Sequence, residues 1–144
     1  MTIRRLLKDL DLRVRTINPS APISDAMSQL ARDDTSALVV TTDDHLVLGI
    51  LSSSDIVKYL NQSGGHLDRL LVSHLMTHDV ISCEATENVQ RIEQLMIEHN
   101  VRHIPVTIDG VLCAVVNILD IVKFRMQSAE KEAGQLRDYV SGVV

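Results

Sequence analysis

The stretch Gly49-Ile50-Leu51-Ser52-Ser53-Ser54-Asp55-Ile56-Val57-Lys58 ends in a tetrapeptide, Asp-Ile-Val-Lys, that recurs unchanged later in the chain as Asp120 to Lys123. The apolar pattern before each copy also matches. A repeated unit too small to bury a full core is expected to pack against its copy. The sequence therefore predicts a pseudo-twofold body with a cleft where the two halves meet.

Each copy has the pattern of the same five elements: strand, helix, strand, strand, helix. In copy one, an extended stretch at 14–17 precedes apolar residues at helical spacing from Ile23 to Ala31, with Ser20 as the expected cap. A continuous apolar run at 37–40 predicts a strand covered on both faces. Residues 46–51 predict its neighbour, and the last helix is expected to begin near Ser52.

Copy two repeats this order from Val80, with Thr86 as the expected cap of its first helix. Asp109-Gly110 separates two apolar runs, which is a strong signal for a hairpin. The first helices align Ile23 with Val89, whereas the tetrapeptides align Asp55 with Asp120. Copy two is therefore one residue shorter between these points.

The segments outside the copies also have a regular pattern. Apolar residues at helical spacing near the N-terminus predict a short helix, and Gly64-Gly65 followed by a leucine-rich stretch predicts a partly structured connection. The expected divisions are an N-terminal helix at 1–13, repeat one at 14–62, a connecting segment at 63–79, repeat two at 80–125 and a helical tail at 126–144.

The tail carries apolar residues that alternate by four and three, as in a short coiled-coil seam. Two interpretations follow from this pattern. The helix either folds back on its own domain or contacts a second subunit. The residues of the seam are Val122, Met126, Ala129, Ala133, Leu136 and Val140.

Composition excludes several classes of protein. Hydrophobic residues make up 45% and charged residues 23% of the chain, which is typical of a soluble globular domain, so we expect no membrane association and a cytoplasmic location. A net charge of −5 and only three aromatic residues argue against binding to nucleic acid. Cys83 and Cys113 lack CxxC spacing and are expected to be reduced, packed thiols.

The start of each last helix is the most informative local feature. Ser52 precedes Asp55 by three positions, and Asn117 precedes Asp120 by three. One interpretation is a capping box, in which the two side chains satisfy backbone N–H groups at the helix start. The other is a polar lip that binds an anion and a vicinal diol, the two groups that a ribose phosphate supplies.

Other chemistry has little support in the sequence. His74 and His78, and likewise His99 and His103, are spaced four apart but lack a third ligand at a set spacing, so we expect no metal site. Neither a nucleophile elbow nor a Gly-rich phosphate loop is present among the six glycines. We therefore expect no enzymatic activity.

Three motifs together resemble a known family. Gly49 to Val57, Leu75-Met76-Thr77 and Val101 to Val106 are similar to the signatures of a tandem pair of cystathionine beta-synthase (CBS) domains, often called a Bateman module. The resemblance covers about residues 14–125. The ending Leu136-Arg137-Asp138-Tyr139 resembles that of stand-alone bacterial members. It implies an α+β fold in which two repeats pack by pseudo-twofold symmetry, with a helix at the N-terminus and a long one at the C-terminus.

The resemblance also implies two ligand sites, one for each copy. In the first, Asp55 would bind the ribose hydroxyls. In the second, Asp120 would do so, with Asn117 where the family has Thr or Ser. Copy two departs from the motif at Ala114 and Asn117, so we expect the first site to be the better one. The other residues implied are Thr16, Ile17, Ala37, Leu38, Ser52 and Ser54 in the first site, and Ser82, Cys83, Arg102, His103, Ile104 and Pro105 in the second.

The function implied by the resemblance is a non-enzymatic regulatory sensor. Its ligand would be an adenine nucleotide, AMP ahead of ADP, ATP or NAD, bound as a regulatory ligand rather than as a required cofactor. The resemblance also implies a homodimer that acts on an unknown effector protein. The alternative is a dimeric scaffold of the same fold that binds no ligand, in which Ser52 and Asp55 only cap a helix.

Overall fold

The computed structural model describes residues 1–9, 14–33, 35–43 and 45–142. Two three-stranded sheets have the orders β1-β2-β3 and β4-β5-β6, and in each the first strand is parallel and the third antiparallel to the central strand. This confirms the α+β class and the predicted order of elements. The elements are α1 (Ile3–Asp9), β1 (Thr16–Ile17), α2 (Ile23–Arg32), β2 (Ala37–Thr41), β3 (Val47–Ser52), α3 (Ser53–Ser63), α4 (Val72–Leu75), β4 (Cys83–Glu84), α5 (Val89–His99), β5 (His103–Ile108), β6 (Val111–Asn117) and α6 (Ile118–Val140).

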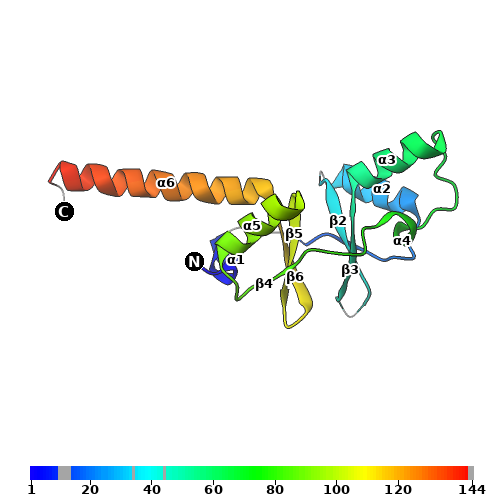
Figure 1. Cartoon of the computed structure of the whole chain (residues 1–144), viewed down its shortest axis with the longest axis horizontal. Coiled ribbons are helices and arrows are strands. Elements are labelled where there is room, and N and C mark those ends of the chain that lie inside the picture. The colour runs from blue at the N-terminus through cyan, green and yellow to red at the C-terminus, as the bar shows by residue number, and fades with distance from the viewer. Residues whose placement is uncertain (10–13, 34, 44, 143–144) are drawn as a thin grey trace.

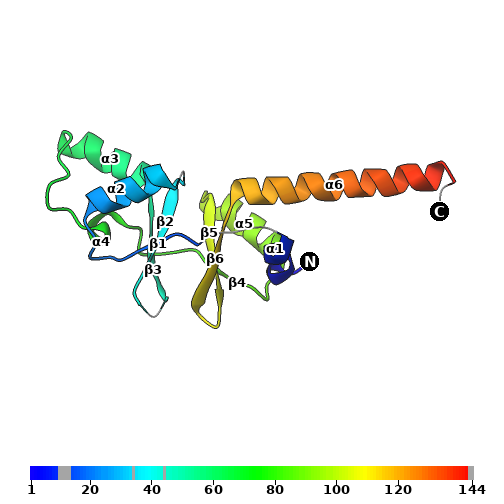
Figure 2. The ribbon, with the colours of Figure 1, turned by 180° about the vertical axis from the view of Figure 1, so that it is seen from behind.

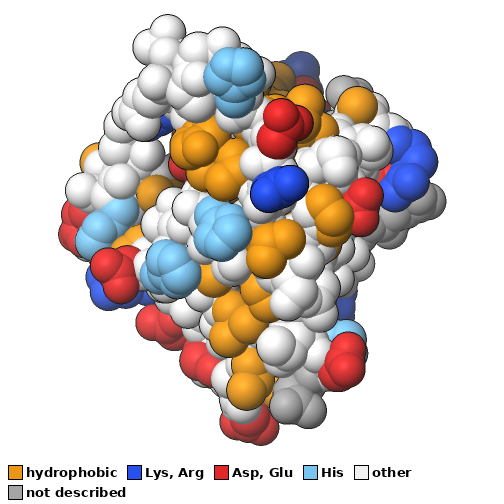
Figure 3. All heavy atoms as spheres, turned by 90° about the vertical axis from the view of Figure 1, so that its right-hand side faces the viewer, with side chains coloured by type: hydrophobic (Ala, Val, Ile, Leu, Met, Phe, Trp, Pro, Cys, Tyr) orange, Lys and Arg blue, Asp and Glu red, His pale blue; other side chains and the backbone are white. Residues whose placement is uncertain are grey.

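The two sheets lie in the middle of the molecule, and the helices lie outside them. Helices α2 and α3 flank the first sheet, and α1 and α5 flank the second (Figures 1 and 2). Each sheet and its helices enclose a hydrophobic core of their own. At the end of the molecule opposite the tip of α6, apolar and histidine side chains reach the surface of the first repeat (Figure 3).

The central strand of each sheet is buried on both faces, as its continuous apolar run predicts. In β2, Leu38 and Val40 belong to the core of the first repeat. Val39 points to the opposite face, because alternate residues of a strand do so, and yet it is only 1% exposed. The corresponding Pro105 of β5 is also buried. The face of each sheet that turns away from its own core is therefore covered by the other half of the molecule.

Backbone hydrogen bonds connect the halves and the connecting segment. The Leu112 N–H donates to the His45 carbonyl at 3.0 Å, which joins the two hairpins. Thr77 and Ile50 exchange backbone hydrogen bonds of 2.8 and 3.1 Å, so the connecting segment extends the edge of the first sheet. Gly49 makes this approach possible, since a Cβ there would lie 2.9 Å from the Thr77 carbonyl oxygen.

The prediction that Ser20 and Thr86 cap the first helix of each repeat was wrong. Helix α2 begins after Pro22 and α5 after Asn88, and neither N-cap residue makes a side-chain capping bond. The Ser20 N–H instead donates to Asn18 Oδ1 at 2.8 Å, within a turn. Polar residues in that turn resemble a cap in sequence, but the N-cap of α2 is Pro22, two positions later, with an extended backbone at φ −62° and ψ 149°.

The N-terminal helix is present, and it packs against the second repeat rather than the first. Ile3 and Leu6 are fully buried in the core of the second repeat. The Ile3 N–H donates to the Glu87 carbonyl at 2.9 Å, and the Arg4 N–H to the Ala85 carbonyl at 2.8 Å. Residues 10–13 of the expected helix lie outside the described residues.

The C-terminal tail is not a separate helix but the continuation of the last helix of repeat two. Helix α6 extends away from the body, with its second half beside no other element that the structure describes (Figures 1 and 2). The interpretation that this helix folds back on its own domain is therefore wrong. In the described part of the chain, no helix is long and apolar enough to cross a membrane.

Both cysteines are free thiols, with Cys83 buried and Cys113 half-buried, as expected. Burial raises the pKa of Cys83 to about 12, and burial also raises the pKa of Cys113. Since the thiolate is the reactive form, both groups are protected from oxidation in the folded protein.

We expect Leu6→Ala to lower the free energy of unfolding by about 2–5 kcal/mol, the usual cost of truncating a buried leucine. The matched control is Arg5→Ala on the exposed face of the same helix, which should change it by less than about 0.5 kcal/mol. Urea denaturation measures both. Equal effects of the two substitutions would contradict the packing of α1 in the core of the second repeat.

Candidate functional site

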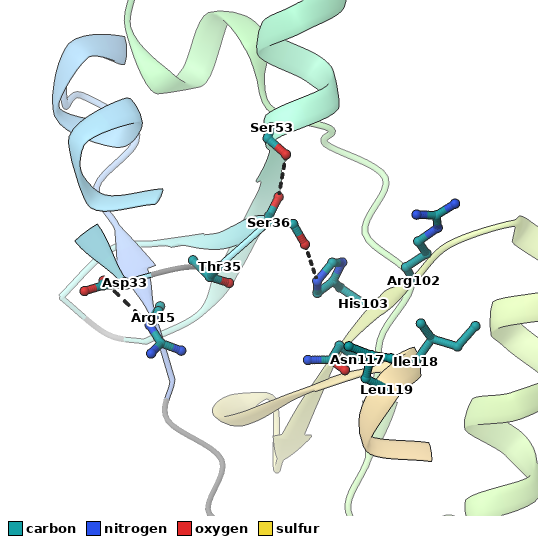
Figure 4. Close-up of a pocket in the computed structure, with 10 residues that line it drawn as sticks. All are labelled: Arg15, Asp33, Thr35, Ser36, Ser53, Arg102, His103, Asn117, Ile118 and Leu119. Carbon is teal, nitrogen blue, oxygen red and sulfur yellow. Dashed lines mark hydrogen bonds and ion pairs between the residues drawn. The ribbon is translucent and has the colours of Figure 1, made fainter. Parts of the chain in front are cut away.

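A cleft of about 580 Å³ opens between the two repeats. The starts of β2 and α3 form one wall, and the starts of β5 and α6 form the other (Figure 4). Such a position, between two domains or repeats, is typical of sites for small molecules. The residues that line it are Arg15, Asp33, Thr35, Ser36, Ser53, Arg102, His103, Asn117, Ile118 and Leu119.

The two walls are built in the same way, as the repeat requires. The Ser53 N–H donates to the Ser36 carbonyl at 2.9 Å in the first repeat. The Ile118 N–H donates to the Arg102 carbonyl at 2.9 Å in the second. Each bond ties the start of a helix to the residue just before the central strand. The two walls therefore have the same backbone arrangement, but their side chains differ and determine the chemistry of each wall.

A hydrogen bond crosses the cleft. Ser36 Oγ lies 3.0 Å from His103 Nε2, so the first repeat contacts the second through these side chains (Figure 4). Burial lowers the pKa of His103, and the positive charge of Arg102 lowers it further, while Asp120 opposes both effects. The imidazole is therefore neutral at pH 7, and the contact carries no net charge.

The cleft is suited to an anion. Among the described residues that line it are two guanidinium groups, of Arg15 and Arg102, and one carboxylate, that of Asp33. Arg15 Nε lies 3.6 Å from Asp33 Oδ2, which offsets one of the two positive charges. Arg102 is exposed, and its fork of N–H donors matches the geometry of phosphate oxygens. Ile118 and Leu119 add apolar surface to the same wall.

Both helix starts form the predicted capping box. The Ser52 N–H donates to Asp55 Oδ2 at 2.9 Å, and the Asp55 N–H donates to Ser52 Oγ at 3.3 Å. Asn117 and Asp120 make the same pair of bonds, at 2.9 and 3.0 Å. In both boxes the N-cap N–H donates to Oδ2 of the carboxylate. Both aspartates are half-buried residues, and neither backbone bond of the box uses Oδ1 of the carboxylate, which leaves that oxygen available to a ligand.

The structure brings three of the predicted site residues into the cleft: Arg102, His103 and Asn117. All three belong to the second predicted site. Asp120 lies beside them, in the capping box with Asn117. The first-site residues are not among those that line this cleft. Of all the remaining predicted residues, Ile17, Ala37, Leu38, Cys83, Ile104 and Pro105 are buried, Thr16, Ser52 and Asp55 are half-buried, and Ser54 and Ser82 are exposed.

Sequence reasoning did not single out seven residues of the cleft. A signal for two of them was available, because Ser36 and Ser53 occupy the positions that Arg102 and Ile118 occupy in the second copy. Arg15 and Asp33 come together across an entire helix, which no local pattern reveals. The full set is Arg15, Asp33, Thr35, Ser36, Ser53, Ile118 and Leu119.

Comparison with known proteins identifies the family. A family model described as CBS domain matches residues 7–62 and residues 72–127. The chain therefore belongs to the CBS domain family, and it contains two copies of the domain, as the resemblance implied.

Curated relatives carry the same domains within longer chains. The CBS domain-containing protein CBSCBSPB3 of Arabidopsis thaliana is 29% identical over 96% of this chain, which spans 26% of that protein. Inosine-5'-monophosphate dehydrogenase of Halobacterium salinarum is 30% identical over 86% of this chain, which spans 25% of the enzyme. CBSX3, a mitochondrial CBS domain-containing protein of Arabidopsis thaliana, is 27% identical over 83% of this chain, and the chain spans 60% of it.

Solved structures match over nearly their whole length. A CBS-domain containing protein from Agrobacterium tumefaciens has a TM-score of 0.80 and 31% identity, over 87% of this chain and 99% of that one. CBSX2, solved in complex with AMP, has a TM-score of 0.76 and 22% identity, over 89% of this chain and 98% of that one. At 22% identity, the similarity to CBSX2 shows a common fold and no more.

We expect the stability of the protein to fall as the pH drops below about 6.5, the ordinary pKa of histidine. Because burial lowers the pKa of His103 in the folded state, the unfolded chain binds this proton first, and acid then favours unfolding. His103→Gln should reduce the loss of stability between about pH 7 and pH 5. His78→Gln, at an exposed position, is the control and should leave it unchanged. An unaltered loss in His103→Gln would contradict this role.

Proposed function

We propose that the protein is a non-enzymatic regulatory module that binds an adenine nucleotide in the cleft between its repeats. The observation that carries the proposal is the wall formed by Arg102, His103 and Asn117, which combines a cation, a neutral hydrogen-bonding ring and an amide in one opening. We propose AMP as the first ligand to test, with ADP, ATP and NAD as alternatives.

The residues of this wall suit the three parts of a nucleotide. Arg102 would bind the phosphate, with Arg15 opposite as a second cation. Asp120 would accept hydrogen bonds from the ribose hydroxyls through the part of its carboxylate that the capping box leaves open. Ile118 and Leu119, which are 44% and 62% exposed, would gain from covering the base.

This assignment favours the second of the two predicted sites. The first, around Asp55, stays a prediction. The structural likeness to CBSX2 supports AMP as the probe, because that protein has the same fold and was solved with this nucleotide. At 22% identity the likeness carries the fold alone, so the ligand is our proposal for this chain.

The route by which ligand binding would alter the outside of the molecule is α6. Its first residues, Ile118 and Leu119, line the cleft, and the same 23-residue helix continues beyond the body. A helix of that length spans about 35 Å. A ligand that moves the first turn would therefore move an exposed surface far from the cleft, and binding would shift the population of helix orientations.

We also propose that the module acts as a homodimer on an effector protein. The competing function is a scaffold of the same fold that takes no ligand. The two capping boxes favour it to the extent that Ser52, Asp55, Asn117 and Asp120 each have a structural role without a nucleotide.

Thermal melting in the presence of AMP, ADP, ATP, NAD or S-adenosylmethionine distinguishes the two functions. A ligand at a concentration of 100 times its Kd raises the free energy of unfolding by about 2.7 kcal/mol. For a chain of this size we expect the Tm to rise by roughly 5–10 °C. No shift with any of the five compounds would favour the scaffold.

Variants then locate the site. Arg102→Gln should weaken AMP binding by about tenfold or more, because a charge-assisted hydrogen bond is worth about 1.5–3 kcal/mol, and should affect adenosine little. Asp120→Asn and Asp55→Asn are a matched pair at the same repeated position. Isothermal titration calorimetry should show a loss for Asp120→Asn and normal binding for Asp55→Asn. The reverse result would move the nucleotide to the first site.

A further inference from the structure

We propose that α6 forms an antiparallel pair with α6 of a second copy of this chain, in the register that places Met126 opposite Ala129. The inference rests on the proposed homodimer and specifies its interface. Apart from Leu119, which also lines the cleft, it concerns a surface outside the cleft, and it does not depend on a nucleotide.

The second half of α6 has little within its own chain to stabilise it. The segment from Met126 to Val140 follows the ion pair between Arg125 and Glu93, and within it only Ser128 and Gly134 are half-exposed rather than exposed. An isolated helix of about 12–15 residues is marginal in water, and a glycine inside it costs about 1 kcal/mol more. Packing of an apolar face normally supplies the missing stability.

The face of α6 that contacts its own body is not the seam. Ile121 is 7% exposed in the core of the second repeat, and Phe124 packs against that core. Arg125 Nε donates to Glu93 Oε1 of α5 at 2.7 Å. The seam lies to one side of these residues and carries most of the exposed large apolar side chains in the second half of the helix, while Tyr139, at 74% exposed, lies outside it. The larger seam residues are Val122 at 45%, Met126 at 59%, Leu136 at 64% and Val140 at 76% exposed. Leu119, one turn before the seam, continues it and is 62% exposed.

The sizes of the seam residues favour the antiparallel orientation. In the proposed register Val122 faces Ala133 of the second copy, Met126 faces Ala129, and Leu119 faces Leu136. The large side chains of Val122 and Met126 then lie opposite alanines, which fills the interface. A parallel pair would instead place Ala129 on Ala129 and Ala133 on Ala133, which leaves two successive layers without side chains large enough to fill the space.

The charges beside the seam agree with this register. On one side Lys123 lies opposite Glu130 of the second copy, and on the other Arg125, which already pairs with Glu93 of its own chain, lies opposite Glu132. By symmetry each pair occurs twice. Flanking charges of opposite sign stabilise such a pair. A parallel pair would also place Glu130 beside Arg125, so the orientation is determined by the sizes of the seam residues. A shift of one heptad would place Glu130 opposite Glu130 and Lys123 opposite Arg137, so the charges also determine the register.

The first experiment tests the surface. Val122 and Val57 occupy the same position in the two repeats and are 45% and 63% exposed. Sedimentation velocity should show a dimer of the full chain, at least tenfold weaker dimerisation in Val122→Glu, and normal dimerisation in Val57→Glu. A monomeric wild-type chain would overturn the proposed homodimer. A dimer broken by Val57→Glu but not by Val122→Glu would overturn this interface alone.

The second experiment tests the orientation. Glu130→Lys should weaken dimerisation by about tenfold, and Lys123→Glu added to it should restore dimerisation, because the two residues then attract again with exchanged signs. In a parallel pair Glu130 would face Arg125, and adding Lys123→Glu would not restore the dimerisation that Glu130→Lys weakens. Failure of the double variant to recover the dimer therefore overturns the antiparallel register. Circular dichroism confirms that each variant is folded.

Discussion

The structure depends on the contact between two sheets whose central strands, β2 and β5, are buried on both faces. One face of each strand completes the core of its own repeat, and the other turns toward the second repeat, where Val39 and Pro105 are buried. Neither repeat can leave its partner without exposing this second face to water, which costs about 25 cal/mol per Å² of apolar surface. The cleft exists because this contact holds two similar edges close together at the strand starts.

The two halves have the same backbone arrangement but different side chains, and that difference gives the cleft its chemistry. Ser36 stands where the second repeat has Arg102, and Ser53 where it has Ile118. A perfectly repeated sequence would present the same groups twice. Here one wall offers small hydroxyls and the ion pair of Arg15 and Asp33, while the other offers a guanidinium that pairs with no described carboxylate, an imidazole and apolar surface. Gly49 and Ala114 differ for a related reason, since the connecting segment pairs with the edge of the first sheet beside Gly49.

Features that depend on neighbouring residues were predictable from the sequence. The repeated Asp-Ile-Val-Lys indicated the duplication, Asp109-Gly110 indicated the second hairpin, and the spacing of Ser52 to Asp55 indicated a capping box. Features that depend on distant contacts were not. The apolar spacing of α1 showed a buried face without showing that the second repeat buries it. The ion pair of Arg15 and Asp33 likewise depends on how the chain returns after α2.

The most direct test of the account is a crystal structure of the chain grown with saturating AMP. The account predicts the nucleotide between the two walls, with its phosphate beside Arg102 and its ribose beside Asp120. A fully occupied nucleotide at any other position, or an empty cleft in crystals that leave its mouth open to solvent, would contradict it.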